Sequence, residues 1–194
     1  MNILLSGVGG QGVLLFSDIL SNLALEAGLD VKKSEVHGMA QRGGSVTSHV
    51  RYGPKVYSPL IEEGTADLLV AFEKLEALRH VHYLAPSGRL VYDPHRIDPL
   101  PVTMGAVARP DEVALDERIK ARAPNHLAVP AFAAALRLGS ARVQNVVMLG
   151  AVSRFVGFTD QAYEDAIRRT VKPAAVELNL RAFAAGRDLA VAAS

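Results

Sequence analysis

Glycines close to the N-terminus give the first sign of a binding site. Gly7, Gly9 and Gly12 match the pattern G-x-G-x-x-G, and Gly10 and Gln11 complete the stretch. In this pattern glycine allows a tight turn, a close approach of backbone to ligand and close packing of a helix on a strand. We expect a positive φ at Gly9, where a side chain would collide with the turn. The unpaired N–H groups at the start of such a helix attract phosphate or another anion, so the stretch predicts an anion site made largely of backbone.

A second glycine-rich stretch carries polar side chains. It contains His37, Gly38, Gln41, Arg42, Gly43 and Gly44. The planar guanidinium of Arg42 suits bidentate binding of a carboxylate or a phosphate, although a surface arginine paired with a nearby carboxylate is the alternative. His37 fits a general base or a structural histidine that bonds to a backbone carbonyl. No residue of either stretch is assigned a catalytic role.

Each stretch follows an apolar run with the character of a strand. Residues 3–5 suit a strand buried on both faces, and residues 29–36 suit a second strand. From Val13 the apolar residues recur at helical spacing, and Gly28 ends the predicted helix. Loops that follow adjacent strands of an open α/β sheet meet at its ligand-binding edge. The two stretches are therefore expected to form one site.

Two other interpretations of these glycines remain open. Glycine solves the steric problem of packing a helix on a strand whether or not a ligand binds. A free-standing Rossmann-like module for NAD, flavin or another nucleotide would use the same turn, and Glu35 is placed to bond a ribose diol. Against NAD, fewer than ten glycine-rich residues follow the second strand, where a dinucleotide fold would have a crossover helix.

The rest of the chain predicts an α/β, Rossmann-like, three-layer fold with a mixed, mainly parallel sheet. Residues 45–52 alternate as a strand, and residues 56–61 are expected to return beside them as a hairpin. A buried strand is predicted at 66–72, and residues 102–104 are a candidate for a further strand. The C-terminal third is predicted to be helical and includes an apolar central helix at 143–156, on which Asn145 must either find a buried partner or face an interface. We expect one domain over residues 1–194.

Composition excludes several classes of function. The net charge of +1 provides no basic surface for nucleic acid and no polybasic arm for a membrane. Neither a signal peptide nor an apolar run of membrane-spanning length is evident, so we expect a cytoplasmic protein. The chain has no cysteine, which excludes disulfides and the thiolates that hold ordinary iron–sulfur clusters. No metal site is predicted.

Taken together, the two glycine-rich stretches resemble a known family. Gly7-Val-Gly-Gly-Gln-Gly-Val13 and His37-Gly-Met-Ala-Gln-Arg-Gly-Gly-Ser-Val46 are similar to the gamma subunits or domains of the 2-oxoacid:ferredoxin oxidoreductases, most of all to the indolepyruvate branch. The resemblance continues through 144–151 and 173–181, so it spans nearly the whole chain.

The resemblance implies an accessory subunit of a larger enzyme. The family oxidises a 2-oxoacid with coenzyme A, releases carbon dioxide and reduces ferredoxin. Thiamine diphosphate, magnesium and iron–sulfur clusters would lie on a larger partner subunit, since this chain has neither cysteine nor the G-D-G motif of thiamine diphosphate sites. The chain is then inactive alone, with its two glycine-rich loops facing a composite active site on the coenzyme A side. A homodimer of the isolated chain is a further alternative.

Overall fold

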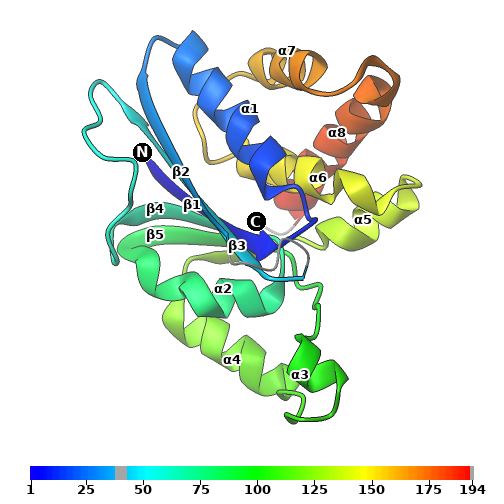
Figure 1. Cartoon of the computed structure of the whole chain (residues 1–194). Coiled ribbons are helices and arrows are strands. Elements are labelled where there is room, and N and C mark those ends of the chain that lie inside the picture. Colours follow the sequence, from blue (N-terminus) through cyan, green and yellow to red (C-terminus); the bar gives the residue numbers. More distant parts are fainter. Residues whose placement is uncertain (38–42, 193–194) are drawn as a thin grey trace.

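A six-stranded sheet forms the middle layer of the molecule (Figure 1). The computed structural model describes residues 1–37 and 43–192. The order of the strands is β2-β3-β1-β4-β5-β6. Strands β1, β4, β5 and β6 are parallel, whereas β3 runs antiparallel to both of its neighbours. The bounds are β1 Asn2–Val8, β2 Asp30–His37, β3 Ser45–Gly53, β4 Ala66–Ala71, β5 Leu84–Tyr92 and β6 His126–Ala128.

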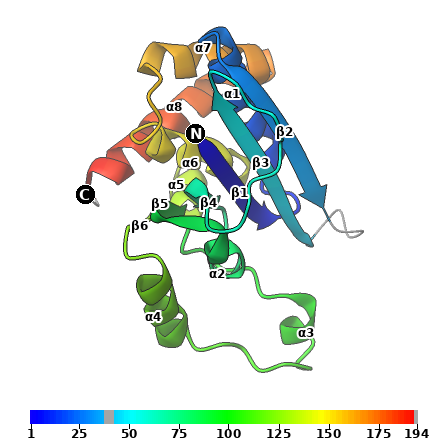
Figure 2. The same cartoon turned by 90° about the vertical axis from the view of Figure 1, so that its left-hand side faces the viewer.

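Helices cover both faces of this sheet (Figures 1 and 2). One face carries α1 (Val13–Glu26), α5 (Ala131–Arg137), α6 (Gln144–Val152), α7 (Asp160–Thr170) and α8 (Val176–Ala192). The other carries α2 (Lys74–His80) and α4 (Glu112–Arg122), with the short α3 (Leu100–Thr103) at the end of that layer. Within the described residues there are also three 3₁₀ turns, η1 (Val81–Tyr83), η2 (Ala141–Val143) and η3 (Pro173–Ala175). The three-layer α/β fold, the mixed sheet and the helical C-terminal third are as predicted.

The alternation of the strands divides the core in two. Ile3 and Leu5 point into the larger cluster beneath α1 and α6, while Leu4 belongs to the smaller cluster beneath α2 and α4. All three side chains are fully buried. A strand covered on both faces favours apolar residues at successive positions, which is why residues 3–5 of β1 form a continuous apolar run.

The helix α6 is the central helix of its layer. Each of its nine residues is buried, and it packs closely on α8. The approach depends on glycine, because a Cβ added at Gly150 would lie 2.0 Å from the carbonyl oxygen of Phe183, and one at Gly186 would lie 1.9 Å from that of Val147. Although α6 is apolar apart from Gln144 and Asn145, none of the described helices is long and apolar enough to cross a membrane.

Two predicted strands are wrong. Residues 56–61 are irregular and do not return beside β3, because both edges of β3 are already paired, with β1 on one side and β2 on the other. The segment crosses the face of β3 instead, where Nδ1 of His49 accepts a hydrogen bond from the amide of Ile61 at 3.1 Å. Residues 102–104 lie in and just after α3, where the amides of Thr103 and Met104 bond back to the carbonyls of Pro99 and Leu100.

A glycine-rich pocket at the carboxyl end of β1

The turn between β1 and α1 has left-handed backbone at two glycines. These are Gly10, with φ 107°, and Gly12, with φ 79°; the positive φ that we expected at Gly9 is wrong. Positive φ occurs at Gly10 and Gly12 because the chain reverses there: Gly10 lies at the tip of the turn and Gly12 is the N-cap of α1. Gly7 is required for packing, because a Cβ there would come within 2.9 Å of a methyl group of Val13. The strand–turn–helix geometry of the pattern is confirmed.

The two glycine-rich stretches meet, but not for the reason inferred from the sequence. The amide of Gly9 donates to the carbonyl oxygen of Gly44 at 2.9 Å, and that of Gly43 to Gly9 at 3.5 Å. The strands that precede the stretches are not adjacent, because β3 lies between β1 and β2. The second stretch instead leads into β3, whose first residue, Ser45, lies opposite Val8.

Part of the second stretch lies outside the described residues. This holds for Gly38, Gln41 and Arg42, whose binding roles stay predictions. His37 is the last residue of β2, opposite Val46 of β3, so its backbone reaches the same edge of the sheet as the first turn.

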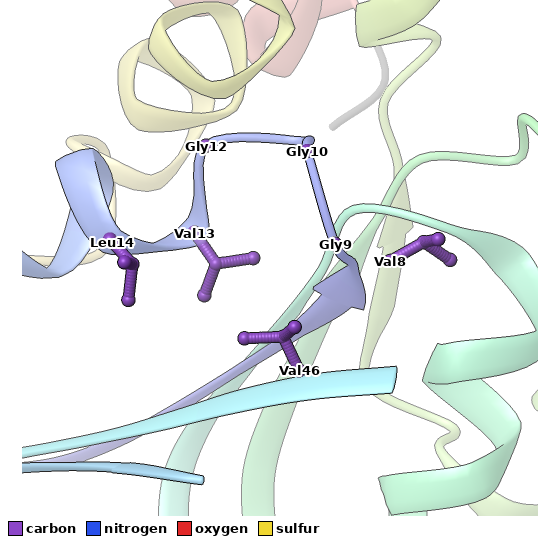
Figure 3. A pocket seen from close by; sticks show the side chains of 7 residues that line it. All are labelled: Val8, Gly9, Gly10, Gly12, Val13, Leu14 and Val46. Atoms are coloured by element: carbon purple, nitrogen blue, oxygen red, sulfur yellow. The ribbon is translucent and has the colours of Figure 1, made fainter. Parts of the chain in front are cut away.

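A pocket of about 460 Å³ opens beside the first turn (Figure 3). The described residues that line it are Val8, Gly9, Gly10, Gly12, Val13, Leu14 and Val46. Figure 3 shows the side chains of Val13 and Val46 projecting into the space between the turn and β3. Among the described residues, the amide N–H groups of Val13 and Leu14 have no hydrogen-bond acceptor, and no charged side chain lines the pocket.

This combination of backbone and apolar surface suits an anion attached to an apolar or extended group. Free amides at the start of the 14-residue α1 supply donors and the positive end of the helix dipole. The methyl groups of Val13, Leu14 and Val46 supply apolar surface. No side chain among these residues can act as an acid, a base or a nucleophile, so the pocket as described can bind and orient but not catalyse.

Gln11 holds the turn in shape. Its Oε1 accepts a hydrogen bond from the amide of Val8 at 2.7 Å, and its Nε2 donates to the carbonyl oxygen of Phe72 at 2.8 Å. Because Phe72 directly follows β4, these two bonds tie the turn to the ends of two parallel strands. Gln11 therefore positions the pocket and has little of its amide left to offer a ligand.

A buried polar network supports the turn from behind. Nε2 of Gln144, at the start of α6, donates to the carbonyl oxygen of Phe72 at 2.8 Å and to Asp93 at 2.9 Å. The carboxylate of Asp93 also accepts from the amides of His95 (2.8 Å) and Phe132 (2.6 Å). Burial raises the pKa of Asp93, and its hydrogen bonds oppose that rise. The network fixes the carboxyl ends of β4 and β5 against α5 and α6.

Asn145 is the second link from α6 to the turn. Its Nδ2 donates to the carbonyl oxygen of Gly12 at 3.2 Å, and this oxygen also accepts the first helical bond of α1, from Phe16. Of the two alternatives expected for Asn145, the buried partner is confirmed. Gln144 and Asp93 were missed by sequence reasoning, although two adjacent amides at the start of an apolar helix already required buried partners.

Buried carboxylates under α2 serve the fold. Glu73 caps α2 by accepting from the amide of Glu76 at 2.9 Å, and burial raises its pKa. Glu76 accepts from the hydroxyl of Ser45 at 2.6 Å and pairs with Arg79. None of these side chains lines the pocket. Among the described residues, no group of three or more His, Asp or Glu side chains is arranged to hold a metal ion.

The geometry opposes the dinucleotide interpretation. A dinucleotide fold brings the acidic residue of its second strand next to the glycine turn. Here Glu35 lies on the edge strand β2, with β3 between it and β1, and its Oε1 is 2.8 Å from Nζ of Lys33.

Sequence comparison places the chain in one family. The model of the pyruvate ferredoxin/flavodoxin oxidoreductase family matches residues 2–189. Among known proteins, the chain is 39% identical over 191 residues to the indolepyruvate oxidoreductase subunit IorB of Thermococcus kodakarensis, covering 95% of this chain and 93% of that protein.

Solved structures share the same fold. The gamma subunit of a keto/oxoacid ferredoxin oxidoreductase from Geobacter sulfurreducens PCA superposes with a TM-score of 0.71 at 27% identity, and the match covers 99% of both chains. The 2-oxoglutarate:ferredoxin oxidoreductase from Magnetococcus marinus, solved with 2-oxoglutarate, coenzyme A and succinyl-CoA bound, gives a TM-score of 0.75 at 22% identity. That match covers all of this chain but 31% of the other. The chain belongs to the pyruvate ferredoxin/flavodoxin oxidoreductase family.

Proposed function

We propose that this chain is the accessory subunit of a 2-oxoacid:ferredoxin oxidoreductase that acts on indolepyruvate or a related aryl pyruvate. The complex would convert the 2-oxoacid and coenzyme A into an acyl-CoA and carbon dioxide, and pass two electrons, one at a time, to ferredoxin. The observation that carries this proposal is the 39% identity to an indolepyruvate oxidoreductase subunit over nearly the whole chain.

The cofactors would lie on a larger partner subunit. The chain has no cysteine, so it cannot supply the thiolates of an ordinary iron–sulfur cluster. The Magnetococcus marinus match supports a division of this kind, because there the same fold makes up 31% of a longer chain. Residues 1–194 would act as one gamma-type domain in the cytoplasm, and the chain would be inactive alone.

The pocket beside Gly7–Gly12 would complete the active site from the side of coenzyme A. The free amides of Val13 and Leu14 suit one of its phosphates, and the apolar wall suits its chain. Arg42 and Gln41 of the second loop, with His37 at the end of β2, would add charge and polar contacts to the same edge. In this arrangement the chain binds and orients the co-substrate, while thiamine diphosphate on the partner supplies the carbanion chemistry.

Purification from native cells tests the proposal. The chain, tagged at its C-terminus, should elute with a stoichiometric larger chain that contains thiamine diphosphate and iron, measured by mass spectrometry and metal analysis. A chain that elutes alone, or that carries bound NAD or flavin, would contradict the proposal and favour a free-standing binding module.

A further inference from the structure

The strand β2 forms one open edge of the sheet. Among the described residues it pairs with β3 alone, as the terminal strand of the order (Figure 2). It is eight residues long and contains neither proline nor glycine. A regular edge of this length presents a row of backbone donors and acceptors to a further strand. Charges on an edge strand restrict such pairing to registers in which unlike charges meet.

The charges of β2 and the length of strand that can overlap together select one register for pairing with itself. Two copies related by a two-fold axis pair antiparallel, with directly opposite residues on the same face. An axis through Lys32, Lys33 or Glu35 would set that residue against its own copy and oppose like charges. Axes through Val31 or Val36 oppose no like charges, but each pairs only three residues of the strand. An axis through Ser34 pairs residues 31–37 and sets Lys33 against Glu35 of the second copy, twice by symmetry.

The two side chains of this contact form an ion pair within one chain and remain partly exposed. Lys33 and Glu35 lie on the same face of β2, with Nζ and Oε1 2.8 Å apart. Each side chain is between a quarter and a third exposed, at 29% and 28%. On the opposite face, Lys32 of one copy would lie against Val36 of the other, where its aliphatic stem can cover an exposed valine.

Exposed apolar side chains flank this edge on both faces. A stable interface buries about 1,000 Å² or more in total, so a strand pair needs such flanking surface. On one face is Leu25 of α1, which is 56% exposed and lies two turns along the helix from Asp18, a partner of Lys33. On the other is Tyr57, which is 89% exposed and next to Val56, whose amide bonds to Asp30 of β2 at 3.0 Å. Antiparallel pairing would bring Val36 of the second copy toward this end.

We propose that β2 is a homodimer interface, in which two copies of this chain pair antiparallel about Ser34 and extend the sheet across the two-fold axis. The proposal is independent of the catalytic function of the complex, since it concerns a surface of the chain alone.

Two charge reversals test both the interface and its register. Glu35→Lys sets Lys33 against a second lysine on the other copy, and Lys33→Glu sets Glu35 against a second glutamate. Each variant makes two symmetric pairs repulsive and should raise the dissociation constant of the dimer roughly tenfold or more. Mixing the two variants makes every opposed pair attractive again, so the mixture should form a heterodimer. Sedimentation equilibrium of the isolated full chain measures the dissociation constant for wild type, for each variant and for the mixture of the two variants. Circular dichroism shows whether each variant is folded.

A matched control and two contrary results complete the test. Glu177→Lys makes the same charge change on the exposed start of α8 and should dimerise like wild type. A monomeric wild-type chain would overturn the proposal. It would do so even if the two variants failed to bind a larger subunit, since β2 would then be an interface with that subunit and not with a second copy. A dimer that survives both reversals, or variants that do not recombine, would also overturn it.

Discussion

At the scale of single residues, the glycine turn depends on two side-chain amides as much as on its glycines. Gln11 bridges the ends of β1 and β4, and Asn145 reaches the turn from α6. The amide of Val8 has Gln11 as its acceptor, and leaving that amide unpaired in a partly buried turn would cost about 1–3 kcal/mol. Asn145 adds a second donor to the carbonyl oxygen of Gly12, which already accepts from Phe16. The pocket is therefore preorganised by residues that do not line it.

Gly12→Ala should destabilise the fold by about 1–3 kcal/mol, through left-handed backbone and overlap with a neighbour. An added Cβ would lie 2.4 Å from Nδ2 of Asn145. Gly10→Ala is the matched control, because φ is also positive there but no atom lies within 4 Å of the added carbon. Urea unfolding should show a larger loss for Gly12→Ala. Equal losses would mean that Asn145 does not restrict the turn.

Leu14→Glu tests the pocket as an anion site without damaging the helix. Leu14 is 44% exposed in the first turn of α1, where a carboxylate stabilises a helix by about 0.3–1 kcal/mol. The same charge should repel an anionic co-substrate, so we expect its Michaelis constant in the assembled enzyme to rise about tenfold while the melting temperature is kept. Leu14→Gln serves as the neutral control.

Steady-state kinetics that vary coenzyme A and the 2-oxoacid separately would show which ligand is affected. If Leu14→Glu assembles and leaves both Michaelis constants unchanged, the pocket does not bind an anion.

At the scale of elements, the segment that crosses the face of β3 buries a histidine. His49 is 6% exposed, and burial, with neighbouring His80, holds its pKa below the usual 6.5. The folded chain therefore binds fewer protons at this site than the unfolded chain. The contribution of neutral His49 is complete above about pH 6.5 and is lost as the pH falls toward the lowered folded pKa.

His49→Asn should make stability less dependent on pH between about 7 and 5, since asparagine does not titrate. Its side-chain oxygen can still accept the hydrogen bond from the amide of Ile61. The free energy of unfolding, measured by urea titration at several pH values, should fall more steeply for wild type than for the variant as the pH decreases. Parallel curves for the two proteins would show that His49 has the same pKa in both states.

Elements that depend on neighbours in sequence were predictable. The strand β1, the turn and α1 follow from apolar spacing and glycines within 28 residues, and α6 follows from its apolar composition. Pairing between distant strands was not predictable. The hairpin expected after Gly53 does not form, because β1 and β2 pair with the two edges of β3. The amino-acid composition of a strand does not indicate how many of its edges pair with other strands.

The candidate site was also predictable only in part. Its glycines and the meeting of the two loops were expected, although the intervening β3 was not. The bond from Gln144 to Asp93 joins residues 51 positions apart, and no local pattern indicates it. A supporting network of this kind becomes visible once the sheet brings the ends of β4 and β5 beside α6.

At the scale of the whole molecule, the same fold occurs as a separate chain and as part of a longer one. It spans 99% of the Geobacter sulfurreducens gamma subunit but 31% of the Magnetococcus marinus chain. The pocket, made of backbone amides and apolar groups, can bind but holds no reacting group among its described residues. In the proposed function, such a unit would contribute to catalysis together with another chain that supplies the cofactors.

The most direct test measures 2-oxoacid-dependent and coenzyme A-dependent reduction of ferredoxin by this chain, by the proposed larger subunit and by the two mixed. We predict that the isolated chain is colourless and inactive, because it has no cysteine with which to hold a cluster. The mixture should reduce ferredoxin with an aryl pyruvate as substrate. A brown, active isolated chain, or a larger chain with full activity in the absence of this one, would contradict the assignment as an accessory subunit.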